Sequence, residues 1–193
     1  AGAKRLTKKS SEFIISGFCY WPFPGDTNHV YLRPFFIGID SSYNEKWIMP
    51  FAVMDSVFGD AFSCISLNDS ILVGVGTRWI EDNSKNSLIM FFNSNGEELG
   101  YFQIQNNEIG NNISYNVSLD IEKINDSVLI TSSVWGNVNN ERIQGELVLS
   151  INGNINKLTE RTEVHGNPKL IKTSDSNFVV MNEVKISSND WDI

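Results

Sequence analysis

Three tryptophans, Trp21, Trp79 and Trp135, recur at similar intervals in this chain. Each ends an apolar run and precedes a polar segment, as in NDSILVGVGTRW at 68–79. Indole rings beside a cavity can stack on sugar rings or on a peptide, because their faces are apolar and their N–H group donates a hydrogen bond. The alternative is that each indole packs between adjacent structural units. We therefore take the three tryptophans as candidate ligand-binding residues.

The polar segments after the tryptophans, at 22–29, 80–86 and 136–142, differ in length and composition. Variable loops on a repeated scaffold usually carry binding specificity. We add Asp26, Asp82 and Glu141, which lie in these segments, to the candidate ligand-binding residues. Carboxylates of this kind, with Glu81, could also bind Ca²⁺. The D-x-D-x-D-G spacing of a calcium loop is absent from the sequence, so we expect no metal site and no cofactor.

Catalytic motifs are also absent. The sequence contains no G-x-S-x-G, P-loop, H-E-x-x-H or paired-cysteine motif. His29 and His165 have no spacing that suggests a metal site or a catalytic triad. The segment DSSYNEKW at 40–47 lacks the glycine that precedes tryptophan in sialidase-type Asp boxes. An enzyme is therefore the less favoured class.

Charge and hydropathy limit the partners. The net charge is −8, and the only basic cluster is Lys4, Arg5, Lys8 and Lys9, which argues against a surface that follows nucleic-acid phosphates. No segment has the roughly 18 to 20 apolar residues of a transmembrane helix. The first nine residues, AGAKRLTKK, lack the apolar centre of a secretory signal. Either a signal has been removed or the chain is an internal piece.

The two cysteines, Cys19 and Cys64, are too few for a disulfide framework. Each lies in an apolar run, which favours two buried free thiols. A single bridge between them is the alternative, because the repeat described next places them in neighbouring units.

A repeat of about fifty residues runs through the chain. Phe13, Ile71, Val128 and Phe178 align at spacings of 58, 57 and 50 residues. The second unit divides into four expected strands, at 61–68, 70–79, 87–94 and 98–105. Apolar runs bounded by Asn, Asp, Ser and Gly are typical of strands that are covered on both faces and joined by tight turns.

The sequence therefore predicts an all-β protein made of four-stranded antiparallel blades of β-propeller type, with about three and a half blades present. The expected blades span 1–58, 59–112 and 113–166, followed by a half-blade at 167–193 that ends where a third strand begins. A β-sandwich does not explain the period. The rungs of a parallel β-helix are much shorter than fifty residues.

The segments EFIISGF, FFIGIDSSYNEKW and DAFSCISLNDSILVGVG resemble the blade repeat of extracellular propeller proteins of Bacteroidota and related bacteria. The resemblance covers essentially the whole chain and implies an extracellular or cell-surface location. Tyr43 stands where that repeat usually has glycine, and no sorting domain is present. The resemblance also implies O-glycosylation at the Asp-Ser-apolar triplets of Ser56, Ser70 and Ser127; the alternative is a simply repeated turn residue.

We expect a non-enzymatic surface or secreted module that binds a glycan or a protein through its loop face, or a part or cargo of an outer-membrane or secretion assembly. The alternative is a carbohydrate-active enzyme with carboxylates in the propeller channel, which would leave no linear motif. Propellers close with about four to eight blades. We therefore expect the chain to be a fragment, or to need a partner chain that completes the ring.

Overall fold

The computed structural model describes residues 1–23, 25–52, 58–80, 84–139, 141–161, 165–173, 177–185 and 191–192. These residues form fifteen strands and one short helix, α1 (Asn106–Ile109), so the all-β prediction is confirmed. No helix in these ranges has the length and apolar character needed to cross a bilayer.

The strands form four separate antiparallel sheets, and within each sheet consecutive strands are neighbours. The first sheet contains β1 (Gly2–Lys9), β2 (Glu12–Phe23), β3 (Asp26–Ile39) and β4 (Glu45–Pro50). The second contains β5 (Phe58–Ser66), β6 (Ile71–Trp79), β7 (Lys85–Asn93) and β8 (Glu98–Ile104). The third contains β9 (Ile113–Asn125), β10 (Val128–Asn137), β11 (Arg142–Ser150) and β12 (Ile155–Arg161). The fourth contains β13 (His165–Lys172), β14 (Phe178–Lys185) and β15 (Trp191–Asp192). The predicted four-stranded antiparallel unit is thus present three times.

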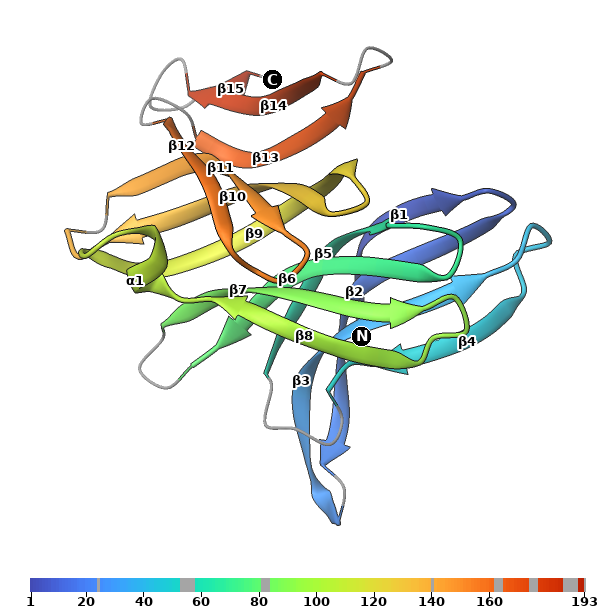
Figure 1. The fold of residues 1–193 in the computed structure, drawn as a ribbon. Coiled ribbons are helices and arrows are strands. Elements are labelled where there is room, and N and C mark those ends of the chain that lie inside the picture. The colour runs from blue at the N-terminus through green and yellow to red at the C-terminus, as the bar shows by residue number, and fades with distance from the viewer. Residues whose placement is uncertain are drawn as a thin grey trace.

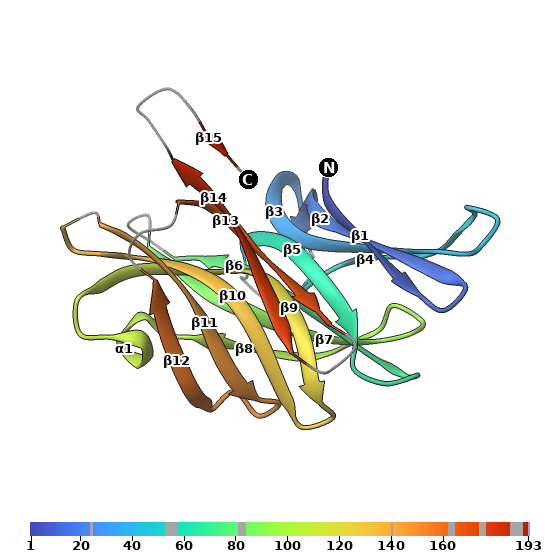
Figure 2. The ribbon, with the colours of Figure 1, turned by 90° about the horizontal axis from the view of Figure 1, so that it is seen from above.

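The repeat alignment is confirmed by the strands themselves. Ile71, Val128 and Phe178 are the first residues of β6, β10 and β14, and Phe13 is the second residue of β2. The sheets follow one another in space in the order of the sequence (Figures 1 and 2). The first strand of each sheet packs against the first strand of the next, β1 on β5, β5 on β9 and β9 on β13. These four first strands are therefore the central elements of the molecule.

The segment 22–29, expected to be a loop, is mostly strand. β2 and β3 continue to pair as far as Pro22 with Val30 and Phe23 with Asp26. Gly25, at φ 85°, lies in the tight turn, where an L side chain would be strained. Strand-forming residues on both sides extend the pairing beyond the apolar run, so the β2–β3 hairpin protrudes from the rest of the molecule (Figure 1).

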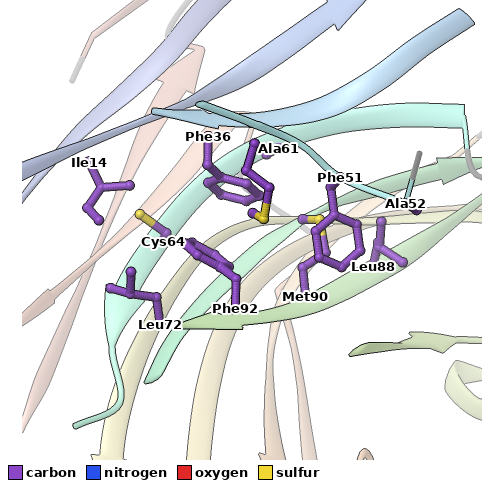
Figure 3. Close-up of a cluster of buried hydrophobic side chains, with 11 residues drawn as sticks. Ile14, Phe36, Phe51, Ala52, Ala61, Cys64, Leu72, Leu88, Met90 and Phe92 are labelled. Atoms are coloured by element: carbon purple, nitrogen blue, oxygen red, sulfur yellow. The ribbon is translucent and has the colours of Figure 1, made fainter. Parts of the chain in front are cut away.

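A hydrophobic cluster fills the space between the first and second sheets (Figure 3). Phe36 and Phe92 are fully buried in it, with ring centroids 4.5 Å apart. Gly74 allows this packing, because a Cβ at that position would lie 2.4 Å from the Phe36 ring. A second cluster lies between the second and third sheets and includes the fully buried Trp135.

The turns between the third and fourth strands repeat the same conformation. Tyr43, Gly96 and Gly153 occupy equivalent positions with φ of 64°, 79° and 92°. A Cβ at Gly96 would lie 2.6 Å from the Trp47 ring of the preceding sheet, and a Cβ at Gly153 would lie 2.9 Å from Phe102. Each of these two turns therefore receives an aromatic side chain from the sheet before it. Tyr43 adopts the positive φ that glycine provides at the other two positions.

Polar contacts join the first strands. The Asp120 carboxylate in β9 pairs with Arg5 in β1 and accepts the backbone N–H of Leu170 in β13 at 3.0 Å. The Thr7 hydroxyl in β1 donates to the carbonyl of Cys64 in β5 at 2.9 Å. Asp120 thus connects the first, third and fourth sheets, and Thr7 connects the first and second.

Both cysteines are free and buried. The interpretation as two buried thiols is therefore confirmed, and the alternative of a bridge is wrong. Burial raises the pKa of Cys19 to about 11 and that of Cys64 to about 12. Few thiolates form at neutral pH, so both side chains behave as small apolar groups.

Candidate functional site

A cavity of about 410 Å³, here called the central pocket, is lined by residues from the first strands of all four sheets. Its remaining described wall comes from the end of β6, where Trp79 is the last residue, from Val134 of β10, and from the starts of β7 and β11, at Lys85 and Arg142. The connections between the second and third strands leave the sheets at this end. The central pocket therefore opens on the side of the polar segments that follow Trp79 and Trp135.

The central pocket is basic although the whole chain is acidic. Its described lining includes Lys4, Arg5, Lys85, Arg142 and Lys169. Asp60 is the one carboxylate among the described lining residues. Since the chain as a whole has a net charge of −8, this concentration of cations is a local feature and does not reflect composition.

Asp60 is half-buried in this basic wall. Burial raises the pKa of the Asp60 carboxyl, and the positive charges of Lys4 and Lys85 partly offset this effect. Thr77, opposite Asp60 in β6, is buried and also lines the pocket. Because two ammonium groups act on the single carboxylate of Asp60, an excess of positive charge remains in the pocket.

Aromatic side chains lie next to the cations. Trp79 is 43% exposed, and the Lys85 Nζ atom lies 4.6 Å from the centroid of its ring. Lys4 Nζ lies 5.5 Å from the ring centroid of Phe62, and Tyr115 also lines the pocket. The wall thus combines flat apolar faces with positive charges, which suits a ligand that has both an apolar face and anionic groups.

A second cavity, of about 750 Å³, is also lined by Trp79 and is here called the side groove. Its lining includes Tyr20, Leu32, Phe58 and Ile80. Tyr20 is 60% exposed and Ile80 is 41% exposed. Trp79 is among the described lining residues of both cavities.

The three candidate tryptophans do not share one environment. Trp21 and Trp79 are 39% and 43% exposed, whereas Trp135 is fully buried. Trp21 and Trp79 are the eighth residues after Phe13 and Ile71, but Trp135 is only the seventh after Val128. An offset of one residue turns a strand side chain to the opposite face. The expectation of three equivalent surface indoles is therefore wrong for Trp135, which follows the packing alternative.

Of the two exposed tryptophans, only Trp79 lies at a described cavity. Trp21 is not among the described residues that line the central pocket or the side groove. Trp21 lies in β2, opposite Tyr31 of β3, in the hairpin that protrudes in Figure 1.

Of the three acidic candidates, Asp26, Asp82 and Glu141, only Glu141 has a described side chain, and it does not line the central pocket. Glu141 is exposed, and its Oε2 atom accepts a 2.6 Å hydrogen bond from the Asn137 side chain. Its backbone N–H donates to Asn137 Oδ1 at 3.0 Å, so Glu141 closes the turn between β10 and β11. Asp26 begins β3, but its side chain lies outside the described part of the structure. Asp82 lies outside the described residues, as does Glu81 of the calcium alternative.

Two of the three candidate O-glycosylation serines occupy equivalent, exposed turns. The carbonyl of Ser70 accepts the backbone N–H of Ser94, and that of Ser127 accepts the backbone N–H of Ile151, both at 3.0 Å. Both side chains are accessible to a modifying enzyme. Ser56 lies outside the described residues.

The basic residues of the central pocket were not identified as site residues from the sequence. A signal for two of them was present, because Lys85 and Arg142 are 57 residues apart, which is the spacing of Ile71 and Val128. Each is the first residue of the third strand in its sheet. A cation that recurs at one repeat position predicts that both cations lie on the same side of neighbouring sheets. Only the packing of the sheets shows that this side lines a cavity.

Within the described ranges, no three His, Cys, Asp or Glu side chains are grouped in a way that could hold a metal ion. No known protein family and no curated protein sequence matches this chain.

Proposed function

We propose that this protein is a non-enzymatic binding module that takes up a glycan on the face where the central pocket and the side groove open. The observation that carries the proposal is the position of Trp79, which lines both cavities and is 43% exposed. A sugar ring stacks its apolar face on such an indole while its hydroxyl groups meet the polar wall. The central pocket, at about 410 Å³, is in the size range of small-ligand sites.

We also propose that each of these sheets is a blade of a β-propeller. Four antiparallel sheets follow one another, with their first strands side by side at the centre, as in a propeller. The fourth sheet exposes Ile171, Val179 and Met181, which are 45%, 48% and 42% accessible. Adjacent apolar side chains of this kind favour a covering partner, which would be a further blade or another chain.

Native mass spectrometry of the purified protein, with identification of co-purifying chains, tests ring completion. We expect a species heavier than one chain of 21.7 kDa. A well-folded monomer at low concentration would contradict the completion of the ring by a partner.

The charges around the central pocket favour binding over catalysis. Glycoside hydrolysis ordinarily uses two carboxyl groups about 5 to 9.5 Å apart on either side of the bond that is cleaved. Asp60 is the one carboxylate among the described lining residues, and the nearby Asp120 is paired with Arg5. The rival function, a carbohydrate-active enzyme, would need a second free carboxylate, and the described lining of the central pocket contains none besides Asp60.

The location that we propose is extracellular or on the cell surface, following the resemblance to propeller repeats of Bacteroidota, with membership of an outer-membrane or secretion assembly as a further part of the proposal. Exposed Ser70 and Ser127 suit O-glycosylation in that setting. Intact-mass analysis of protein from the native source tests the modification, and an unmodified mass would remove it.

Substitution of Trp79 tests the proposed function. The wild type is screened on an array of glycans, and the best ligand is titrated by calorimetry against Trp79→Ala and Trp21→Ala. We expect Trp79→Ala to weaken binding at least about tenfold, since buried aromatic anchors carry much of a binding energy. Trp21→Ala removes an equally exposed indole that lines neither cavity, and should bind as the wild type does. Equal affinity for all three proteins would refute this site.

A further inference from the structure

The basic wall of the central pocket indicates which glycans would bind. We propose that the ligand is an anionic glycan, with carboxylate or sulfate groups on its sugar rings, and that Lys4, Lys85 and Arg142 bind these groups. This inference rests on the proposed function, because it specifies the ligand class of the same site.

The charges in the central pocket do not balance. Of the described lining cations, Arg5 is neutralised by the buried Asp120. Asp60 is acted on by both Lys4 and Lys85, so one carboxylate faces two ammonium groups. The remaining imbalance is positive. Lys4 and Arg142 are exposed and Lys85 is half-buried, so dissolved salt partly screens their charges. An anion that enters the pocket would restore the balance.

Arg142 strengthens this argument. Its guanidinium donates to the carbonyl oxygen of Gly166 and, at 3.4 Å, to Asn167 Oδ1. Both acceptors are uncharged, so these bonds orient the guanidinium without neutralising it. A guanidinium that is already oriented can give a planar carboxylate or a sulfate a charge-assisted hydrogen bond with little further ordering.

The arrangement of Lys85 and Trp79 favours a sugar over a peptide. The Lys85 Nζ atom lies 4.6 Å from the indole centroid, so a cation and a flat apolar surface adjoin. A uronic acid or a sulfated sugar presents an anionic group at the edge of a ring whose face is apolar, and can use both neighbours at once. The carboxylates of an acidic peptide are carried on flexible side chains that lack such a face.

Calorimetric titration of the full chain tests the inference. The probes are an oligogalacturonate, a sulfated oligosaccharide derived from heparin, a neutral oligogalactose of matched length, and polyglutamate. We expect at least one anionic sugar to bind about tenfold or more tightly than the neutral one, and to bind more weakly as salt rises. The first two probes show whether carboxylate or sulfate is preferred.

Three variants link the binding to the pocket. Lys85→Ala should weaken binding of the anionic sugar about tenfold, which is the usual consequence of losing one charge-assisted hydrogen bond. Lys46→Ala is the matched control, because Lys46 is a partly exposed lysine in β4 that pairs with Glu12 away from the pocket, and it should change nothing. Asp60→Asn removes the opposing carboxylate and should tighten binding several-fold. If Asp60 had only a structural role, Asp60→Asn would not tighten binding of the anionic sugar.

The outcomes separate the two proposals. If the neutral sugar binds as tightly as the anionic ones and Trp79→Ala abolishes that binding, the module still binds glycans and the anionic preference is refuted. If polyglutamate binds as tightly as the anionic sugars, the ligand is an acidic peptide and the inference is likewise overturned. If no sugar binds, the proposed function itself fails.

Discussion

Replacement of Asp120 tests the packing that positions the central pocket. The Asp120 side chain is 1% exposed and pairs with Arg5 of the first sheet. It also accepts the backbone N–H of Leu170 in the fourth sheet, at 3.0 Å. A substitution here therefore removes contacts among three sheets at one point.

Asp120 Oδ1 also accepts the neighbouring backbone N–H of Ile121 at 2.9 Å, and the two contacts between sheets allow a magnitude to be worked out. Asp120→Ala leaves the backbone N–H of the 2%-exposed Leu170 without its acceptor, which costs about 1 to 3 kcal/mol. It also leaves Arg5 without its partner; because Arg5 is 28% exposed, this loss adds only about 1 kcal/mol. We expect a total of about 3 kcal/mol. Asp120→Asn keeps an oxygen acceptor for Leu170 and should cost about 1 kcal/mol.

Urea denaturation followed by circular dichroism measures these differences. Asp126→Ala is the matched control, since the Asp126 side chain, just after β9, is 83% exposed and its ion pair in the described part of the chain is with Lys123. It should leave the unfolding midpoint unchanged. If Asp120→Ala were as stable as Asp126→Ala, then the buried carboxylate would not hold the first strands together and the reasoning would be refuted.

Three further predictions concern buried groups. Trp135→Ala should lower the free energy of unfolding by about 3 to 5 kcal/mol, measured by urea denaturation, because the fully buried indole leaves a cavity. Burial and the neighbouring Asp120 raise the pKa of the Glu122 carboxyl above 4.5, so this group stabilises the fold most below pH 4.5 and loses that effect as the pH rises through its folded pKa. Glu122→Gln should therefore increase stability at neutral pH and flatten the pH profile of unfolding; an unchanged profile would contradict this. Cys19 and Cys64 should not react with a thiol reagent at neutral pH until the protein is denatured, and rapid labelling of the native protein would show that they are accessible.

Much of the fold could be predicted because its signals are local. Apolar runs bounded by Asn, Asp and Gly mark the strands of the second sheet to within a few residues, and the repeat sets their alignment. The turn position of Tyr43 was also visible in the sequence, because Tyr43 stands where the repeat usually has glycine. Its φ of 64° is close to those of the two glycines at equivalent positions. The extension of the β2–β3 hairpin was not predicted, because Pro22 and Gly25 are ordinarily loop residues.

The site was harder to predict because its residues come from several sheets. Lys4, Asp60, Lys85 and Lys169 lie in four different strands, and no linear spacing joins them. Trp79 was identified because it closes a strand, a position that recurs with the repeat. Trp135 shows the limit of that reasoning, since a difference of one residue in the strand determines whether an indole faces solvent or the core.

A crystal structure of the protein with a bound anionic oligosaccharide would test the central claim most directly. Our account predicts the sugar in the central pocket, with one ring stacked on Trp79 and an anionic group within hydrogen-bonding distance of Lys85 or Arg142. A sugar bound elsewhere on the molecule, with the central pocket empty, would contradict it.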